Sequence, residues 1–363
     1  MSVLHGSLEG ADVIICCGPG GVGKTTASAA LALDLAEQGK RVVVLTVDPA
    51  RRLAEALGLT ETSDAPVAVP GIRRGSLHAV MLDAEGTFDA LIERYATSPE
   101  QAASIKTNRL YRSLVGGLSG TQEYMAMEKL YELYESDDFD LVVVDTPPTR
   151  NALDLLDAPR RLTSFLENRI FRALLAPTQL YLRAVSFATR ALLSTIGKVA
   201  GAELVDDAVT FFQAFAGMEE GFAARAGAVH DRLRAEGTAF VLVTSPRSDA
   251  ITEARFFQDQ LIEAEMHTAA VIVNRVRPSF GALQVPDDAR AAPGALRALV
   301  ANLERAEQLA SLDLHALSDL ADAVAPAPVC TLPLTSEELH DVEGLRNLGL
   351  HLNDDAEPAA PER

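Results

Sequence analysis

Residues 18–25 read Gly-Pro-Gly-Gly-Val-Gly-Lys-Thr and match the spacing G-x-x-x-x-G-K-T of a phosphate-binding loop. In such a loop, glycines allow consecutive backbone N–H groups to point inward at an anion. Lys24 would reach the β- and γ-phosphates of a nucleotide, and the hydroxyl of Thr25 would bind Mg²⁺. The alternative is a glycine turn without a ligand, which the complete motif disfavours.

The residues on either side of the loop predict the elements that position it. Residues 12–17 form a short apolar run, which is typical of a buried strand. Residues 26–38 are rich in good helix formers and end before Gly39, so we expect a helix there. Strand, glycine loop and helix together would direct the positive end of the helix at a bound phosphate.

Two more apolar runs end on aspartates, Asp48 and Asp145. Runs of this kind are typical of strands buried on both faces of a parallel sheet. Open α/β sheets bind ligands at the carboxyl ends of their strands. Asp145 therefore has the form of the acidic residue that holds the metal in phosphoryl-transfer sites, and we expect it to do so through water.

The alternation of apolar runs and helical stretches predicts an α/β fold. We expect a P-loop NTPase with a mostly parallel, doubly wound sheet flanked by helices, plus an inserted all-helical subdomain. Strand signals are missing between 151 and 235. The expected parts are a discontinuous nucleotide-binding domain (1–150 and 236–350), a helical subdomain (151–235) and a disordered acidic tail (351–363).

The composition limits the possible partners and compartment. The chain has 363 residues and a net charge of −19, which argues against a general nucleic-acid surface. Three cysteines make no disulfide framework and indicate a reducing compartment. We see no secretory signal at the N-terminus and no apolar run of the roughly 18 residues that a spanning helix needs. The expected location is the cytoplasm.

The stretch 160–200 is basic, with seven Arg or Lys residues and one acid, Glu167. A basic amphipathic stretch can mark a membrane surface or a groove for a partner. An ordinary helical subdomain with solvated arginines has the same pattern. Both interpretations stay open.

Three motifs together resemble the ArsA ATPase family. They are residues 20–26 (GGVGKTT), 46–50 (TVDPA) and 145–149 (DTPPT), and they occur in the family's order. The family, of the deviant-Walker-A class, includes the arsenite-pump ATPase and the guided-entry ATPase that targets tail-anchored membrane proteins. The chain resembles in particular the bacterial ArsA-like subunits often described as anion-transporting ATPases.

The resemblance implies a dimer that closes over ATP and Mg²⁺. It implies that Asp48 orients or activates the attacking water and that Asp145 lies near the metal. The expected nucleotide contacts are Gly20, Gly21, Val22, Gly23, Lys24, Thr25, Thr26, Asn274, Leu332 and Pro333. Thr26 would contact the α-phosphate and Asn274 the adenine amide, and the loop around residues 332–334 (Leu332, Pro333 and Leu334) would wall the adenine. Asn274 could instead be a turn residue after a strand. The strand end lacks the N-K-x-D guanine motif, which favours ATP over GTP.

The sequence departs from the family at Pro19, where the family has a lysine that reaches the partner's phosphates. A homodimer should therefore be slow unless Arg51 or Arg150 substitutes. A heterodimer with an ArsA-like paralogue that keeps the lysine would restore the cation. The second switch reads Arg150-Asn151 in place of the usual Gly-His. The chain has no C-x-x-C, so we expect no zinc.

Three functions follow as hypotheses. The first is a Mg-ATPase that works as a nucleotide-gated dimer switch, as a homodimer or with a paralogue. The second is a targeting factor whose segment 151–235 binds a hydrophobic helix or a membrane protein; Met218 is the single methionine there, which weakens this idea. The third is a catalytically weak regulatory subunit of an ATPase heterodimer.

Overall fold

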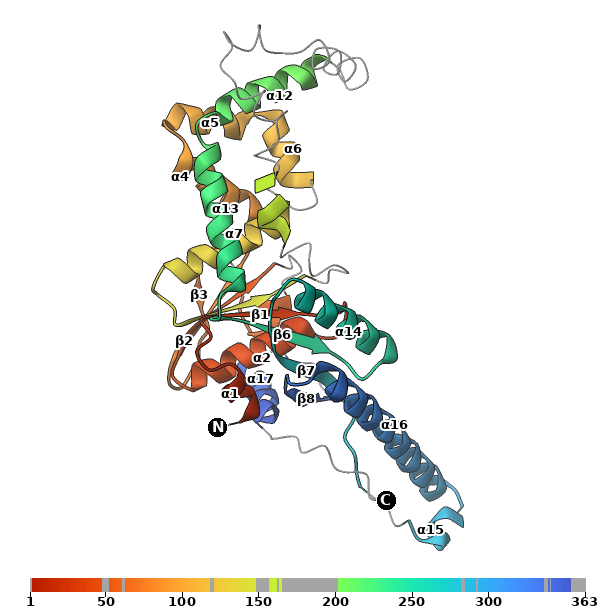
Figure 1. The fold of residues 1–363 in the computed structure, drawn as a ribbon. Coiled ribbons are helices and arrows are strands. Elements are labelled where there is room, and N and C mark those ends of the chain that lie inside the picture. The colour runs from red at the N-terminus through yellow and green to blue at the C-terminus, as the bar shows by residue number, and fades with distance from the viewer. Residues whose placement is uncertain are drawn as a thin grey trace. The chain divides into compact units, whose positions relative to one another are not determined.

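A twisted sheet forms the core of one of the two compact units of the chain (Figure 1). The computed structural model describes residues 2–47, 52–60, 63–117, 121–147, 157–161, 163–164, 202–281, 285–291, 293–335, 339 and 341–353. The chain divides into two compact units. We call Met1–Met81, Ser136–Ala152 and Glu236–Arg363 the sheet unit, and Leu82–Glu135 with Leu153–Ala235 the helical unit.

The sheet has eight strands in the order β3-β4-β2-β5-β1-β6-β7-β8. All neighbouring pairs are parallel except β3 with β4. The strands are β1 Val13–Cys17, β2 Arg41–Thr46, β3 Val67–Ala68, β4 Ser76–Met81, β5 Leu141–Asp145, β6 Thr238–Thr244, β7 Thr268–Val276 and β8 Val329–Pro333. Because β1 is central and the chain extends outward on both sides of it, the predicted mostly parallel, doubly wound α/β fold is confirmed.

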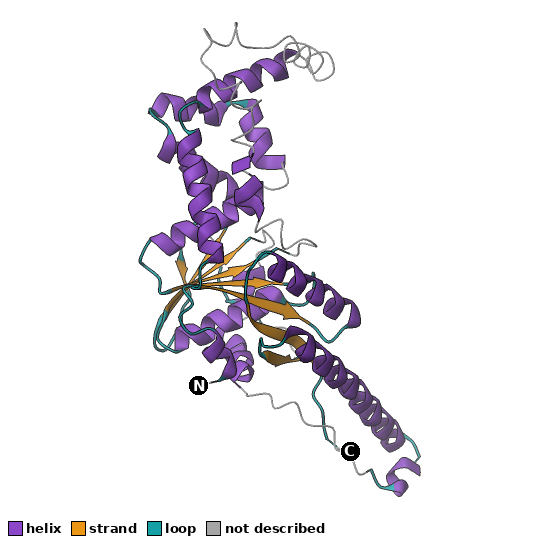
Figure 2. Ribbon diagram, viewed as in Figure 1, coloured by secondary structure: helices purple, strands orange, loops and turns teal. Residues whose placement is uncertain are grey.

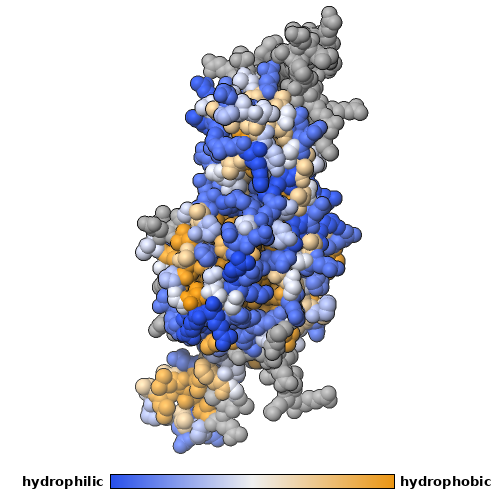
Figure 3. All heavy atoms as spheres, turned by 90° about the vertical axis from the view of Figure 1, so that its left-hand side faces the viewer, coloured by the Kyte–Doolittle hydropathy of each residue, from blue (hydrophilic) through white to orange (hydrophobic). Residues whose placement is uncertain are grey.

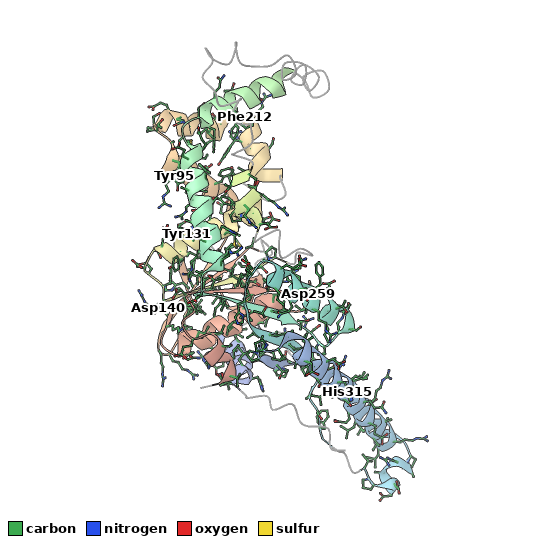
Figure 4. All side chains as sticks on the ribbon, in the orientation of Figure 1. Tyr95, Tyr131, Asp140, Phe212, Asp259 and His315 are labelled. Carbon is green, nitrogen blue, oxygen red and sulfur yellow. The ribbon has the colours of Figure 1, made fainter. Side chains whose placement is uncertain are left out.

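The central strands are apolar because both of their faces are covered. Every residue of β1, β5 and β6 is buried. At the start of β2, the backbone N–H of Arg41 donates to Oδ2 of Asp140 at 2.8 Å. Asp140, labelled in Figure 4, directly precedes β5. The guanidinium of Arg41 pairs with the same carboxylate and lowers its pKa. This pair fixes the neighbouring start of β5.

Helices flank the sheet (Figure 2). Within the sheet unit they are α1 Val3–Ser7, α2 Lys24–Glu37, α3 Arg52–Ala56, α14 Ser248–Glu263, α15 Asp287–Ala291, α16 Ala295–Val324 and α17 Val342–Leu350, followed by the 3-10 turn η1 His351–Asn353. α2 is buried along most of its length and packs against α17. Its small residues allow this helix to lie close to the sheet.

The long helix α16 is buried only toward its end, at residues such as Leu317 and Leu320. Its first part exposes large apolar side chains, among them Leu296 and Leu299. Figure 3 shows apolar side chains gathered at the lower end of the view, where Figure 1 places α15 and the start of α16. Among the described residues, no helix is both long and apolar enough to cross a membrane.

The helical unit contains α4 Ala84–Tyr95, α5 Pro99–Thr107, α6 Arg109–Gly117, α7 Thr121–Glu135, α12 Ala202–Phe215 and α13 Glu219–Arg234. Side-chain caps start two of them: Asp83 accepts from the N–H of Glu85, and Ser98 accepts from that of Gln101. An aromatic core joins these helices, with the rings of Phe215 and Phe222 centred 5.0 Å apart.

A buried ion pair links α7 to α13 in this unit. Nε of Arg225 donates to Oε1 of Glu128 at 2.7 Å, and the guanidinium lies over the ring of Tyr131, 4.2 Å from its centre.

The residues of α4 to α7 pack with α12 and α13, although the sequence pattern placed 82–135 in the nucleotide-binding domain. Most of the basic stretch 160–200 and the tail after 353 lie outside the described residues.

Candidate functional site

The predicted phosphate loop lies between β1 and α2, at the carboxyl end of the central strand. The loop passes so close to neighbouring strands that two positions must be glycine. A Cβ on Gly18 would lie 2.0 Å from the carbonyl oxygen of Val243 in β6. A Cβ on Gly23, whose φ is 88°, would lie 2.3 Å from Nδ2 of Asn274 in β7. The glycine spacing is therefore required by packing as well as by turn geometry.

Lys24 is folded back over the loop. Its Nζ donates to the carbonyl oxygens of Gly18 and Pro19, each at 3.0 Å, and only 6% of the residue is exposed. α2 begins at Lys24, and no side chain caps its first turn. A helix N-terminus without a side-chain cap, next to a buried ammonium group, is an arrangement that binds phosphate.

Asp145 joins the second motif to the loop. Its Oδ2 accepts hydrogen bonds from the hydroxyls of Thr25, at 2.7 Å, and Thr46, at 3.1 Å. The strand register brings these groups together, since Asp145 lies opposite Cys16 of β1 and Thr46 of β2. The carboxylate is 1% exposed.

The donor set of Thr25 and Asp145 fits Mg²⁺. A hydroxyl and a carboxylate are hard oxygen ligands, and Mg²⁺ commonly takes one or two protein ligands beside substrate phosphates and waters. Within the described residues, no three His, Cys, Asp or Glu side chains gather as a metal cluster. One carboxylate with one hydroxyl is a different pattern, in which the substrate completes the coordination.

Asn274 and Arg275 contact the loop from the end of β7. Nδ2 of Asn274 donates to the carbonyl oxygen of Val22 at 3.0 Å. Nη1 of Arg275 donates to the carbonyl oxygen of Gly21 at 3.1 Å. These two hydrogen bonds hold the side of the loop that faces the end of β7, which we call its outer side.

A cleft of about 510 Å³ opens beside this outer side. Its other walls come from the segment after β6 with the start of α14, from the end of β7, from α16 and from the residue after β8. The lining residues outside the loop include Ser245, Arg247, Arg275, Arg277, Leu309, Leu312, Asp313 and Leu334. Arg277 is held there by an ion pair with the buried Asp313, at 2.7 Å. The hydroxyl of Ser245 is buried and has no hydrogen-bond partner within the described part of the chain.

The structure assigns different surroundings to the residues expected around adenine. Leu332 is 0% exposed and belongs to the core, whereas Leu334, 48% exposed, lines the cleft. Alternation along β8 would place positions 332 and 334 on the same face, so the strand period does not separate the two leucines; they differ because β8 ends at Pro333 and Leu334 follows it. Pro333 is partly buried between them. Thr46 and Ser245 were missed because single hydroxyls at strand ends carry no motif.

Other expected residues are placed as follows. Gly20 and Gly21 are exposed at the loop, and Thr26 is partly buried in the first turn of α2. Asp48 lies outside the described residues, as do Arg51, Arg150 and Asn151.

The cysteines are free thiols in the core. Burial raises the pKa of both Cys16 and Cys17 to about 12. Their thiolates are therefore rare at neutral pH, and they are poor nucleophiles.

Comparison with known proteins agrees with this geometry. The model of the family described as anion-transporting ATPase matches residues 11–354. An uncharacterized protein of Streptomyces coelicolor is 33% identical over 270 residues, which cover 73% of this chain and 62% of that protein.

Two named relatives match over shorter stretches. The ATPase asna-1 of Caenorhabditis elegans is 32% identical over 154 residues, covering 40% of this chain and 44% of the relative. A putative arsenical pump-driving ATPase 2 of Aquifex aeolicus is 32% identical over 155 residues, covering 41% and 50%. The chain thus spans between 44% and 62% of these three relatives.

Proposed function

The chain belongs to the family of anion-transporting ATPases, and on this premise we propose that it binds Mg-ATP and hydrolyses it to ADP and phosphate. The observation that supports this most is the hydrogen bond from Thr25 to Asp145. It joins the phosphate loop to the acidic end of a second strand, and these are the recurring parts of a phosphoryl-transfer site.

Each residue has a role in this proposal. The ammonium of Lys24 and the N-terminus of α2 offset the charge of the phosphates. Thr25 and Asp145 hold Mg²⁺, which when bound withdraws charge from the phosphate oxygens. Thr26 contacts the α-phosphate, and Asp48 orients the attacking water, as the family resemblance implies.

The cleft beside the loop is the proposed site of the base and ribose. Its lining combines apolar side chains, Leu309 and Leu334 among them, with charged side chains and the buried hydroxyl of Ser245. Apolar surface can pack against a base, and polar groups can fix its orientation. Leu332 and Pro333 then contribute by positioning Leu334, the next residue in the chain, at the cleft.

The site works as a nucleotide-gated dimer switch in the cytoplasm, paired with a paralogue that supplies the signature lysine. Pro19 cannot supply that cation, and a cation contributed by a partner chain is worth several powers of ten in rate in related reactions. A lone chain is therefore a slow ATPase. If its own turnover is negligible, the chain is the regulatory subunit of an ATPase heterodimer, which is the third hypothesis.

Steady-state phosphate release tests this pairing. Pro19→Lys should raise the turnover of the lone chain at least about tenfold, while Pro19→Ala, which removes the ring without adding charge, should not. Adding a lysine-bearing ArsA-like paralogue to the wild-type chain should raise turnover as well. If neither the lysine nor the paralogue raises turnover, the pairing is wrong.

A second candidate function is client binding by the helical unit. It is favoured by the division of the chain into a nucleotide-handling unit and a separate helical one. A 20-residue apolar helix, fused to a soluble carrier, should co-purify with the chain. It should not co-purify with a variant in which residues 82–135 and 153–235 are replaced. Capture that survives this replacement would argue against a client site in the helical unit.

A further inference from the structure

Thr146, the first residue after β5, is bound to the neighbouring strand β1 by its side chain as well as by its backbone. Its hydroxyl donates to the carbonyl oxygen of Cys16 at 2.8 Å, and its backbone N–H donates to the same oxygen at 3.3 Å. The residue is 6% exposed. The hydroxyl bond is the shorter of the two, so this end of β5 is held more firmly than by the backbone bond alone.

This bond lies between the two motifs of the site. In the strand pairing, Cys16 lies opposite Asp145, which directly precedes Thr146. Along its own strand, Cys16 is followed by Cys17, the last residue of β1, and then by the phosphate loop. The bond from Thr146 to Cys16 thus joins the end of β5 to the start of the loop.

Two side-chain hydrogen bonds therefore connect the end of β5 with the loop and the strand before it. One runs from Thr25 to the carboxylate of Asp145 at 2.7 Å, between the two groups proposed for Mg²⁺. The other runs from Thr146 to Cys16, which is 0% exposed, so this bond lies in the protein interior. It can hold the strand end in place while the carboxylate exchanges its own partners.

We infer that Thr146 is a positioning residue for the metal site: its hydroxyl bond to β1 fixes the distance between Asp145 and Thr25, and thereby the affinity for Mg²⁺ beside ATP. This inference rests on the proposed function. Thr46 contacts the carboxylate itself, at 3.1 Å from the β2 side, whereas Thr146 fixes the backbone that carries this carboxylate. The hydroxyl of Thr146, rather than the bulk of the side chain, has this role.

A residue that only stabilised the sheet would behave differently. Its loss would lower the unfolding free energy and leave the Mg²⁺ dependence of ATP binding unchanged, because the folded molecules would keep an intact site. Loss of a positioning bond changes the site of the folded molecule itself. One neutral hydrogen bond is worth roughly fivefold in affinity.

Mg²⁺ titration of ATP binding to the full chain separates the two roles. Thr146→Val, which keeps the shape and loses the donor, should raise the Mg²⁺ concentration for half-maximal ATP binding about fivefold. The ATP affinity measured in EDTA should stay unchanged, and Thr146→Ser should restore the wild-type Mg²⁺ dependence. The matched control is Thr268→Val, which should change neither value. Thr268 is buried at the start of β7, and its hydroxyl has no hydrogen-bond partner within the described residues.

A second measurement needs no ligand. Hydrogen exchange of the metal-free chain, followed in a peptide that covers residues 141–147, should be faster in Thr146→Val and unchanged in Thr146→Ser, because the strand end loses its shorter bond only in the valine variant. The exchange of the other peptides shows whether the valine variant is folded. If it is not, Thr146→Ala, which also lacks the donor, takes its place with the same expectations.

The outcomes are distinct. Wild-type Mg²⁺ dependence in Thr146→Val would overturn the inference, whether or not the stability of the variant is lowered. Unchanged hydrogen exchange in that variant, or an equal loss of Mg²⁺ affinity in Thr146→Ser, would overturn it too. If the wild-type chain bound no ATP, or if Mg²⁺ did not raise its affinity for ATP, the proposed function itself would fail.

Discussion

The hydroxyl of Thr25 donates a 2.7 Å hydrogen bond to Oδ2 of Asp145, although the two residues are 120 positions apart in the chain. One begins the helix after the phosphate loop, and the other ends the neighbouring strand β5. The parallel pairing of β1 with β5 brings both to the same edge of the sheet. The bond therefore holds together the two oxygen donors that we propose for Mg²⁺.

Removing the hydroxyl of Thr25 should reduce the contribution of Mg²⁺ to ATP binding. We compare the affinity for ATP with and without Mg²⁺. Thr25→Val should reduce the increase in ATP affinity that Mg²⁺ causes by roughly tenfold, while the ATP affinity measured in EDTA changes little. Thr25→Ser, which keeps the hydroxyl, should behave like wild type. Calorimetric titration with and without Mg²⁺ gives both values, and an unchanged Mg²⁺ gain in Thr25→Val would contradict the assignment.

Thr46 should act through Asp145. Its hydroxyl lies 3.1 Å from the carboxylate Oδ2 and would orient that group from the β2 side. Thr46→Val, which keeps the shape and loses the donor, should raise the Mg²⁺ concentration for half-maximal ATP binding about fivefold. Rescue by Thr46→Ser distinguishes this role from packing, and a valine variant with normal Mg²⁺ dependence would exclude it.

The pair of Arg225 and Glu128 should stabilise the helical unit. Arg225→Met leaves a buried carboxylate unpaired, which should cost about 3–5 kcal/mol of that unit's unfolding free energy. Burial already raises the pKa of Glu128, so without Arg225 the folded state would bind a proton more tightly than the unfolded state. Since stability falls with rising pH wherever the folded state binds more protons, the loss should be larger at pH 8 than at pH 5.

Urea unfolding at the two pH values, with hydrogen exchange of α7 and α13, measures this effect. The exposed Arg112 on α6 offers the control Arg112→Met, which should cost little at either pH. Glu128→Gln in the Arg225→Met background should remove the pH dependence. A loss that is equal at both pH values would refute the ionic explanation.

Cys16 and Cys17 should be inert in the folded protein. With the pKa raised from 9.0 to about 12, the thiolate fraction at pH 8 falls about a thousandfold, and burial also blocks access. Ellman's reagent should label neither residue in the native state and both in denaturant. Labelling of the native protein within minutes would show that β1 opens readily.

Local spacing determined most of what could be predicted. The motif of residues 18–25 and the apolar run that ends at Asp145 predicted the loop, the central strands and the sheet type. The division into two units could not be predicted from the sequence, because α4 to α7 pack with α12 and α13 through an aromatic core formed by residues distant in sequence. The cleft was missed for the same reason: its walls come from the phosphate loop and four further segments that only the fold brings together.

Hydrogen bonds between residues distant in sequence were equally hidden. Asn274 was noticed as a strand-end residue, yet its contact with Val22 depends on how β7 lies beside the loop. The difference in burial between Leu332 and Leu334 depended on where β8 ends, because Leu332 lies in the strand and Leu334 follows it.

Calorimetric titration of Mg-ATP into the wild-type chain and into Lys24→Ala tests the central claim most directly. We predict saturable binding to wild type, and a loss of roughly 10- to 100-fold in Lys24→Ala, because a charged hydrogen-bond donor to the phosphates is removed. Lys40→Ala, in the turn between the far end of this helix and β2, should bind like wild type. Absence of binding to wild type, or equal binding to Lys24→Ala, would contradict the account.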